Sequence, residues 1–275
     1  MTDRAGFLPQ ESLEALERAA AELAALAGAE ISGALGATLA VRYKGGGPEG
    51  DIFRDPVSEV DHRTEMLIRE RLARDFPGHG ILGEELDDVP ADEKGLVWAV
   101  DPIDGTTNFV NGFPLFAASV GVLHHGRPVA GAVWCATSHA LRPGVYHARE
   151  GGRLRFESEV LELHPNPAVR RRLAGSPGLD PKPAPHWDHR KTGSAAVECA
   201  FVAAGLMQVA WFATPNVWDV AGGIVLAQAS GRTVHSGGGA GWAPFQGFDP
   251  ADLHGWRGPL ALGEPEAVAA LLAEA

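Results

Sequence analysis

The sequence predicts a mixed α/β fold in which helices and β-sheets pack on one another in layers. Patterns typical of amphipathic helices open the chain, short β-type segments follow up to about residue 150, and apolar helices and strands occupy the remainder. The chain has 275 residues, 45% of them hydrophobic and 21% charged, which is enough for one large domain or two small ones with a sizeable core.

Two amphipathic helices are expected in the N-terminal half, residues 1–150. Leucines at helical spacing place the first helix from Pro9 to about Gly28, where the glycine is expected to end it. The second helix is expected over residues 58–76, with alternating charges outward and Asp61 in its first turn or at its cap. Both helices are expected to back a β-sheet.

The strands of this half are expected to form an antiparallel sheet. Residues 37–43 look like a strand, and residues 44–56 collect glycine, proline and charge in the manner of a mobile loop. The segment HHGRP has the composition of a turn in an antiparallel hairpin. The short β-type runs lie at residues 79–85, 96–101, 115–126, 127–134 and 144–150.

The C-terminal half, residues 151–275, is predicted to have an α/β pattern and to form one compact unit with the first half. The stretch from about 165 to 190 is rich in proline and shows no readable element. Apolar helices are expected at residues 193–205 and 219–231, with a terminal helix at 265–275, and strands are expected at residues 232–236 and 258–263.

The composition excludes several classes of protein. A formal net charge of −12 argues against binding to nucleic acid or to an anionic membrane, because such binding needs lysine and arginine to neutralise phosphates. No stretch of about 18 apolar residues predicts a membrane span, and the N-terminus lacks the pattern of a signal peptide, so the expected compartment is the cytoplasm. Cys135 and Cys199 stand alone and are expected to be buried thiols.

The segment WAVDPIDGTTNFVNGFP, residues 98–114, carries the strongest chemical signal. Pro102 stiffens the turn after a predicted strand, so that Asp101 and Asp104 can point into one cleft. The carbonyl of Ile103, freed from sheet pairing, is expected to face the same cleft. Carboxylate and carbonyl oxygens are the ligands that Mg²⁺ prefers, and bound cations would reverse the sign of an acidic site. This segment therefore predicts a magnesium site that accepts a phosphorylated ligand.

A helical turn that starts at GTTNF would add an anion site beside the metal, because the N–H groups of Gly105 and Thr106 would be free to bind a phosphate. A bare DxxD is more often a solvent-facing helix cap, so the motif alone is weak. Acidic groups at residues 58–61 and 83–85 lie beside apolar elements, where unpaired charge is costly. Asp219 starts an apolar helix and is either a plain N-cap or a further metal ligand.

Together these segments resemble the inositol monophosphatase family of Mg²⁺-dependent, lithium-sensitive phosphatases, which hydrolyse phosphomonoesters of small molecules. The resemblance runs from about residue 44 to 235 and rests on WAVDPIDGTTNFVNGFP, supported in order by DPVSEVD, ILGEE, GSAAVE and WDVAGG. It implies a layered αβαβα sandwich of the sugar phosphatase type, with the N-terminal half carrying most of the metal ligands and two or three Mg²⁺ ions bound where the halves meet.

The resemblance also implies the ligands of these ions. Glu84, Asp101 and the Ile103 carbonyl would hold the first Mg²⁺, near which the attacking water is activated. Asp101 would bridge to a second Mg²⁺, which Asp104 and Asp219 would also hold. The second ion would stabilise the ester oxygen as it leaves, in an in-line displacement.

Further residues match supporting positions of the family. Asp61 and Thr106 match the pair that orients the nucleophilic water or supports a further, weakly held Mg²⁺. The amides of Gly105 and Thr106 would receive the phosphate. Glu85 is expected to support the ligands from behind, and Lys44 falls where the family has a basic residue of its mobile loop.

On the substrate side, Gly193, Ser194 and Ala195 match the stretch of the family that faces the alcohol portion, although Ser194 is equally suited to be only a helix cap. Seven residues before Asp219, inositol-specific members carry a glutamate that binds ring hydroxyls, and this chain has Phe212. A phenylalanine accepts no hydrogen bond, and a buried hydroxyl without a partner costs about 1–3 kcal/mol. This departure argues against myo-inositol 1-phosphate as the substrate.

The resemblance leaves several functions open. Related scaffolds host fructose-1,6-bisphosphatase, histidinol-phosphatase and 3′-phosphoadenosine nucleotide phosphatase activities. A non-catalytic regulator that binds a phosphorylated ligand on the same fold is the alternative from another class. It is less favoured because every expected acidic position is filled. The family further suggests a homodimer, with a small-molecule phosphomonoester as the partner and neither nucleic acid nor membrane.

Overall fold

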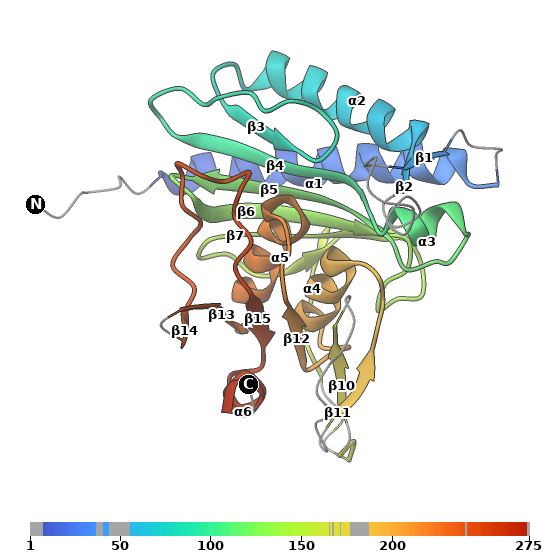
Figure 1. The fold of residues 1–275 in the computed structure, drawn as a ribbon, viewed down its shortest axis with the longest axis vertical. Helices are drawn as coiled ribbons and strands as arrows, with labels where there is room; N and C mark the ends of the chain where they lie inside the picture. Colours follow the sequence, from blue (N-terminus) through green and yellow to red (C-terminus); the bar gives the residue numbers. More distant parts are fainter. Residues whose placement is uncertain are drawn as a thin grey trace, which may run out of the picture.

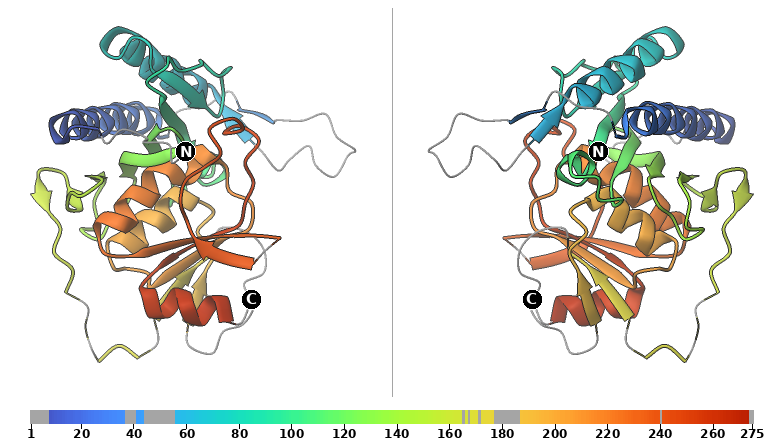
Figure 2. Two further views of the ribbon diagram at one scale, coloured as in Figure 1. Left: turned by 90° about the vertical axis from the view of Figure 1, so that its left-hand side faces the viewer. Right: turned by 90° about the vertical axis from the view of Figure 1, so that its right-hand side faces the viewer.

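The computed structural model describes residues 8–36, 41–43, 56–164, 166, 168–170, 172–176, 187–239 and 241–273. Within these residues the helices are α1 (Gln10–Ala34), α2 (Glu59–Asp75), α3 (Thr106–Val110), α4 (Ala195–Ala203), α5 (Val217–Ala229) and α6 (Pro265–Ala273). Helices α1 and α2 cover one face of a first sheet, α4 and α5 lie between it and a second sheet, and α6 covers the far face of the second sheet (Figures 1 and 2). This arrangement confirms the αβαβα fold predicted from the sequence.

The first sheet has the order β3-β4-β5-β6-β7-β8-β9. Its pairs are antiparallel except at one edge, where β3 pairs with β4 in parallel. The expectation of an antiparallel sheet is therefore wrong for β3, because the chain returns to β4 through a loop rather than a hairpin. The strands are β3 (Gly80–Gly83), β4 (Leu96–Asp104), β5 (Ala117–His124), β6 (Arg127–Cys135), β7 (Gly144–Arg149), β8 (Arg155–Phe156) and β9 (Glu159–Val160).

The second sheet has the order β11-β10-β12-β15-β13-β14 and mixes parallel and antiparallel pairs. Two of its strands, β10 and β11, lie in the stretch in which the sequence shows no readable element. The strands are β10 (Arg172–Gly175), β11 (Trp187–Arg190), β12 (Val209–Phe212), β13 (Thr233–Gly238), β14 (Gly241–Pro244) and β15 (Leu260–Gly263), and a separate two-stranded sheet pairs β1 (Val41–Tyr43) with β2 (Pro56–Ser58).

Helix α1 is longer than predicted. It does not end at Gly28 but continues to Ala34, with Ile31 fully buried in the core. Gly28 serves close packing instead, since a Cβ atom there would lie 2.3 Å from the indole of Trp134 on β6. The glycine that looked like a stop signal is therefore a point of contact between helix and sheet.

Helix α5 approaches the other face of the first sheet equally closely. A Cβ atom on Gly121 of β5 would lie 2.6 Å from Ala221, and one on Gly131 of β6 would lie 2.7 Å from the backbone of Gly222. Side chains at these glycines would push α5 away from the sheet. The close approach matters for function because Asp219 lies in the first turn of α5.

The predicted boundary between the two halves, at residue 150, falls before the last two strands of the first sheet, since β8 and β9 extend that sheet to Val160. Helices α4 and α5 follow later in the chain but pack against strands of the first sheet. None of the helices described is long and apolar enough to cross a lipid bilayer. Cys135 and Cys199 are both buried and unpaired, as expected.

A buried charge network ties α1 to β7. Glu17 is only 5% exposed, and its carboxylate pairs with Arg149 Nη1 at 2.5 Å and His147 Nδ1 at 2.7 Å. Burial by itself raises the pKa of Glu17, but the hydrogen bonds from His147 and Arg149 outweigh it, so the pKa lies below its usual value. The ionised carboxylate therefore stabilises the folded chain at neutral pH.

We predict that Glu17→Gln lowers the free energy of unfolding at neutral pH by about 3 kcal/mol, because it leaves buried donors without a charged acceptor. The wild-type advantage is present above the ordinary glutamate pKa of 4.5 and is lost as the pH falls through the lower folded-state value. Urea denaturation of both proteins between pH 7 and acid pH measures the difference. A difference that stays constant as the pH falls would contradict this assignment.

Candidate active site

The centre of the site is the end of β4. The pairing of β4 with β5 shifts register between Asp101 and Asp104, so Pro102 and Ile103 stand outside the regular ladder. The carbonyl of Ile103 is thereby released, and it accepts a hydrogen bond from Thr106 Oγ1 at 2.9 Å. The Ile103 side chain is buried in the core on the opposite side, at 1% exposure. Asp101, Asp104 and the Ile103 carbonyl, which the sequence analysis grouped, therefore all lie at this bulge.

Helix α3 begins directly after this bulge, as predicted. Gly105 precedes it with a φ of 91°, a left-handed conformation that favours glycine. Thr106 Oγ1 also lies 3.0 Å from Asp61 Oδ1, which joins α3 to α2. Asp61 is fully buried at the third position of α2 and completes a capping box with Ser58. The structure therefore brings Asp61 and Thr106 into contact, 45 residues apart in the sequence.

Two residues that the sequence analysis did not single out hold the loop that carries Glu84. Glu65 on α2 is fully buried and accepts a hydrogen bond from the Glu85 amide at 2.8 Å. Arg69, one turn further on, binds Glu65 Oε1 at 2.8 Å and donates to the carbonyls of Leu86 and Asp87. A sequence signal does identify such a pair: an acidic residue lies on the inward face of a predicted helix, and an arginine follows four residues later.

Asp219 comes to the site on α5. The sequence made it an N-cap candidate, but the N-cap is Asn216, and Asp219 is the third residue of the helix. Asp219 Oδ2 accepts the amide of Asn216 at 2.8 Å, so it closes a capping box from inside the helix. A plain N-cap role for Asp219 is therefore wrong, because the helix begins two residues earlier than the apolar pattern indicated.

Electrostatic interactions show that four acidic side chains from these segments lie near one another; below they are called the four carboxylates, namely Glu84, Asp101, Asp104 and Asp219. Burial raises the pKa of Asp101 well above its usual range, and repulsion from the other three adds to this. The pKa of Asp219 is raised likewise, by burial first and by Asp104 next. Burial raises the pKa of Asp104 to about 7, although donors from Ala196 and Ser194 oppose it.

The chemistry of this group fits a divalent cation. Glu84 lies close enough to Asp101 to raise the pKa of that carboxyl, since two adjacent carboxylates cannot both stay ionised at low cost. A hard cation with oxygen ligands would relieve the same repulsion. In the described part of the chain, no three acidic, histidine or cysteine side chains already stand at metal-ligand spacing. Ion binding would therefore turn these side chains toward a common point.

Protein donors hold one oxygen of several of these side chains. Asp101 Oδ1 accepts the Ile103 amide at 3.0 Å, and Asp104 Oδ2 accepts the Ser194 hydroxyl at 2.7 Å and the Ala196 amide. Each of these bonds holds one oxygen of Asp101 or Asp104 in place. They also connect β4 to the start of α4, which carries the residues predicted to face the substrate.

Ser194 is the helix cap that the sequence analysis offered as one of its two roles, and it also contacts Asp104. As N-cap of α4 it accepts the Val197 amide at 3.1 Å, and its hydroxyl donates to Asp104. Gly193 precedes it with a φ of 78°, and a Cβ atom there would lie 3.1 Å from the Asn108 amide. Ala195, 7% exposed, is the first residue of the helix. The three residues predicted for the substrate side therefore form one turn against α3 and β4.

Phe212 is 2% exposed and packs in the core between α5 and the second sheet. Its burial explains how an apolar residue is accommodated where inositol-specific members carry a glutamate. Lys44 lies outside the described residues, as do all residues of the predicted mobile loop before Pro56.

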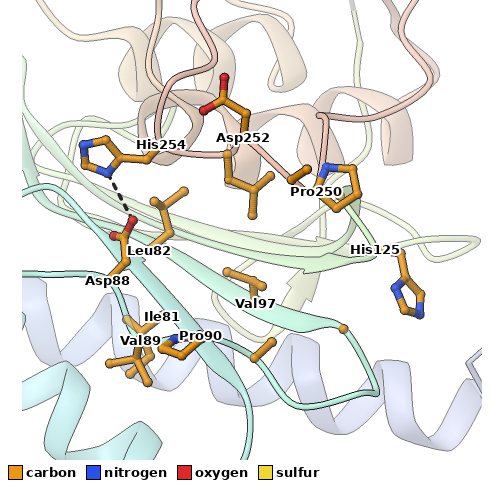
Figure 3. A pocket seen from close by; sticks show the side chains of 15 residues that line it. Ile81, Leu82, Asp88, Val89, Pro90, Val97, His125, Pro250, Asp252 and His254 are labelled. Atoms are coloured by element: carbon orange, nitrogen blue, oxygen red, sulfur yellow. Dashed lines mark ion pairs between the residues drawn. The ribbon is translucent and has the colours of Figure 1, made fainter.

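A cavity of about 400 Å³ lies beside β3 and β4, but none of the four carboxylates lines it. Its floor includes Leu82 and Val97, and residues 250–254 cover it from the side of the second sheet (Figure 3). His254 Nδ1 and Asp88 Oδ2, 3.2 Å apart, form an ion pair across it. The cavity therefore lies between the first sheet and residues 250–254, and it is distinct from the predicted phosphate site.

We predict that Arg69→Ala lowers the free energy of unfolding by about 3 kcal/mol, because Glu65 stays buried without its counter-ion. Hydrogen exchange at the Glu85 amide should also accelerate, since its acceptor is no longer fixed. Arg71→Ala is the matched control on the same helix. Arg71 pairs with Glu22 and Asp75 at the exposed surface, so its loss should lower the free energy of unfolding far less than the loss of Arg69. Equal effects of the two variants on the Glu85 amide would contradict the role given to Arg69.

Comparisons with known proteins agree with this architecture. A family model described as the inositol monophosphatase family matches residues 12–272. The protein named Phosphatase IMPL1, chloroplastic, from Arabidopsis thaliana is 30% identical over 231 residues, which cover 78% of this chain and 60% of that protein. Inositol-1-monophosphatase SuhB of Mycobacterium tuberculosis is 36% identical over 197 residues, covering 66% of this chain and 68% of that protein.

Solved structures show the same fold over nearly the whole chain. Mycobacterium tuberculosis SuhB superposes with a TM-score of 0.66 at 27% identity, covering 98% of each chain. The extragenic suppressor protein suhB from Bartonella henselae superposes with a TM-score of 0.73 at 24% identity, covering 94% of this chain and 97% of that chain. The second likeness concerns the fold alone.

Proposed function

This chain belongs to the inositol monophosphatase family and is on that ground a phosphoric monoester hydrolase, and we propose that it uses Mg²⁺ to hydrolyse a small-molecule phosphomonoester to an alcohol and inorganic phosphate. The observation that carries the proposal is the mutual repulsion of the four carboxylates beside the start of α3. Such a group is costly to bury unless cations neutralise it.

The proposed metal ligands follow from this placement. Glu84, Asp101 and the Ile103 carbonyl would hold one Mg²⁺, and Asp101, Asp104 and Asp219 would hold a second, with a third, weakly held ion near Asp61. When bound, the ions would supply an activated water and would neutralise the charge that develops on the leaving oxygen. The protein itself would orient the reacting groups and keep them out of unproductive positions.

Asp61 and Thr106 would orient the attacking water. Because the Thr106 hydroxyl can donate to Asp61 Oδ1 or to the Ile103 carbonyl, its lone pairs stay available to accept a proton of a water molecule. The amides of Gly105 and Thr106, at the start of α3, lack intrahelical partners and would bind the phosphate oxygens. Glu85, whose amide is held by Glu65, would support Glu84 from behind.

The substrate is proposed to be a phosphomonoester other than myo-inositol 1-phosphate, such as a sugar phosphate. Gly193, Ser194 and Ala195 would face its alcohol portion. Phe212 offers no acceptor for ring hydroxyls, and its burial in the core leaves no polar replacement at that position. Fructose-1,6-bisphosphatase, histidinol-phosphatase and 3′-phosphoadenosine nucleotide phosphatase activities are the rivals. The homodimer, the cytoplasmic location and the lithium sensitivity stay predictions.

We predict that the purified protein releases phosphate from at least one ester of a panel containing these rivals, and only when Mg²⁺ is present. Asp104→Asn should lower kcat at least about 100-fold, because one metal-binding charge is lost at the reacting centre. Glu150→Gln is the control, since Glu150 lies at the surface, where it pairs with Arg127. Phosphate release that needs no metal, or inactivity on every ester, would refute the proposal. Retained ligand binding without turnover would favour the regulator.

A further inference from the structure

Glu198 on α4 is a fully buried acidic residue to which the proposed function assigns no role. It is 0% exposed and stands among alanine, valine and cysteine in the helix AAVECAFVA. Its Oε1 accepts the Thr192 hydroxyl at 2.7 Å and the Thr192 amide at 3.3 Å. Its Oε2 is buried without a hydrogen-bond partner. The Ser176 amide faces the carboxyl but donates to the Arg190 carbonyl at 3.0 Å.

An ionised carboxylate is poorly suited to this position. Burial raises the pKa of Glu198 to about 8, so the carboxyl is mostly protonated at neutral pH. In that form Oε1 is a carbonyl acceptor for the two donors of Thr192, and Oε2 carries the proton. Oε1 accepts both donors of Thr192 whether or not the carboxyl is ionised, so this contact does not depend on the charge of Glu198.

Glu198 is connected through Thr192 and then Ser194 to the residues predicted to face the substrate. Thr192, 3% exposed, precedes Gly193 and Ser194, and its carbonyl accepts Asn108 Nδ2 at 2.7 Å. Its hydroxyl also lies 3.0 Å from the carbonyl of Ser194. The Ser194 hydroxyl then donates to Asp104 at 2.7 Å. Glu198 and Asn108 thus hold the turn formed by residues 192–194 from two sides.

We propose that Glu198 is a positioning residue that fixes the 192–194 turn through its hydrogen bonds with Thr192 and so sets the surface that faces the alcohol portion of the substrate. The inference rests on the proposed function. The hydrogen bonds of Glu198 go to Thr192 and not to the phosphate site or the four carboxylates. Its loss should therefore weaken substrate binding more than it slows the chemical step, which separates KM from kcat.

Glu198→Gln is the decisive variant because the amide keeps the shape, the neutral charge and an acceptor for Thr192. We expect a KM and a kcat close to those of wild type at pH 7. Glu198→Ala should raise KM about tenfold with kcat nearly unchanged, a fold-change that corresponds to about 1.4 kcal/mol of lost binding free energy. A KM of Glu198→Ala equal to that of wild type, a KM of Glu198→Gln raised as far as that of Glu198→Ala, or an equal fall of kcat in both variants would overturn the inference.

Hydrogen exchange of the segment around residues 190–197 gives a readout that does not need catalysis. Glu198→Ala should accelerate exchange at Gly193 and Ser194, whereas Glu198→Gln should leave it unchanged at pH 7. If wild type hydrolyses no ester, the proposed function fails on its own, and the exchange data still decide whether Glu198 holds the turn. Unchanged exchange in a folded Glu198→Ala variant would overturn the inference even in an active enzyme.

Discussion

Repulsion among the four carboxylates is the constraint on which the candidate site depends. The chain brings them from β4, from the loop after β3 and from the first turn of α5, and burial strengthens their interaction. Isolated in a protein interior, such a group would oppose folding. The surrounding capping boxes and hydrogen bonds reduce that cost, and bound Mg²⁺ would remove most of it.

The fold supplies the precision that this arrangement needs. The bulge in β4 releases the Ile103 carbonyl, and the Glu65–Arg69 pair holds the loop of Glu84. Glycines in β5 and β6 let α5 approach the first sheet, which carries Asp219 toward the end of β4. Local backbone features and close packing therefore place the acidic groups, while the layers of the sandwich give them a rigid support.

Much of this could be predicted from the sequence, because the segment around Asp101 and Asp104 combines strand, turn and helix signals in a short span. The limits are physical. Gly28 looked like a helix end because periodicity does not reveal that Trp134 packs there. The N-cap role of Asn216 could not be recognised because the apolar pattern of the helix starts later in the sequence. Strands β10 and β11 lie in a proline-rich stretch, and they form only by pairing with strands that are distant in the sequence. Glu65 and Glu198 act through tertiary contacts, so only their charge on apolar helix faces marks them.

The most direct test of the central claim is a crystal structure of the protein grown with Mn²⁺ in place of Mg²⁺, with anomalous scattering used to locate the metal. The account predicts anomalous peaks within coordinating distance of the four carboxylates, whose side chains should have turned toward the ions. Ordered crystals that show no peak there at millimolar Mn²⁺, or that show the metal bound only elsewhere, would contradict it.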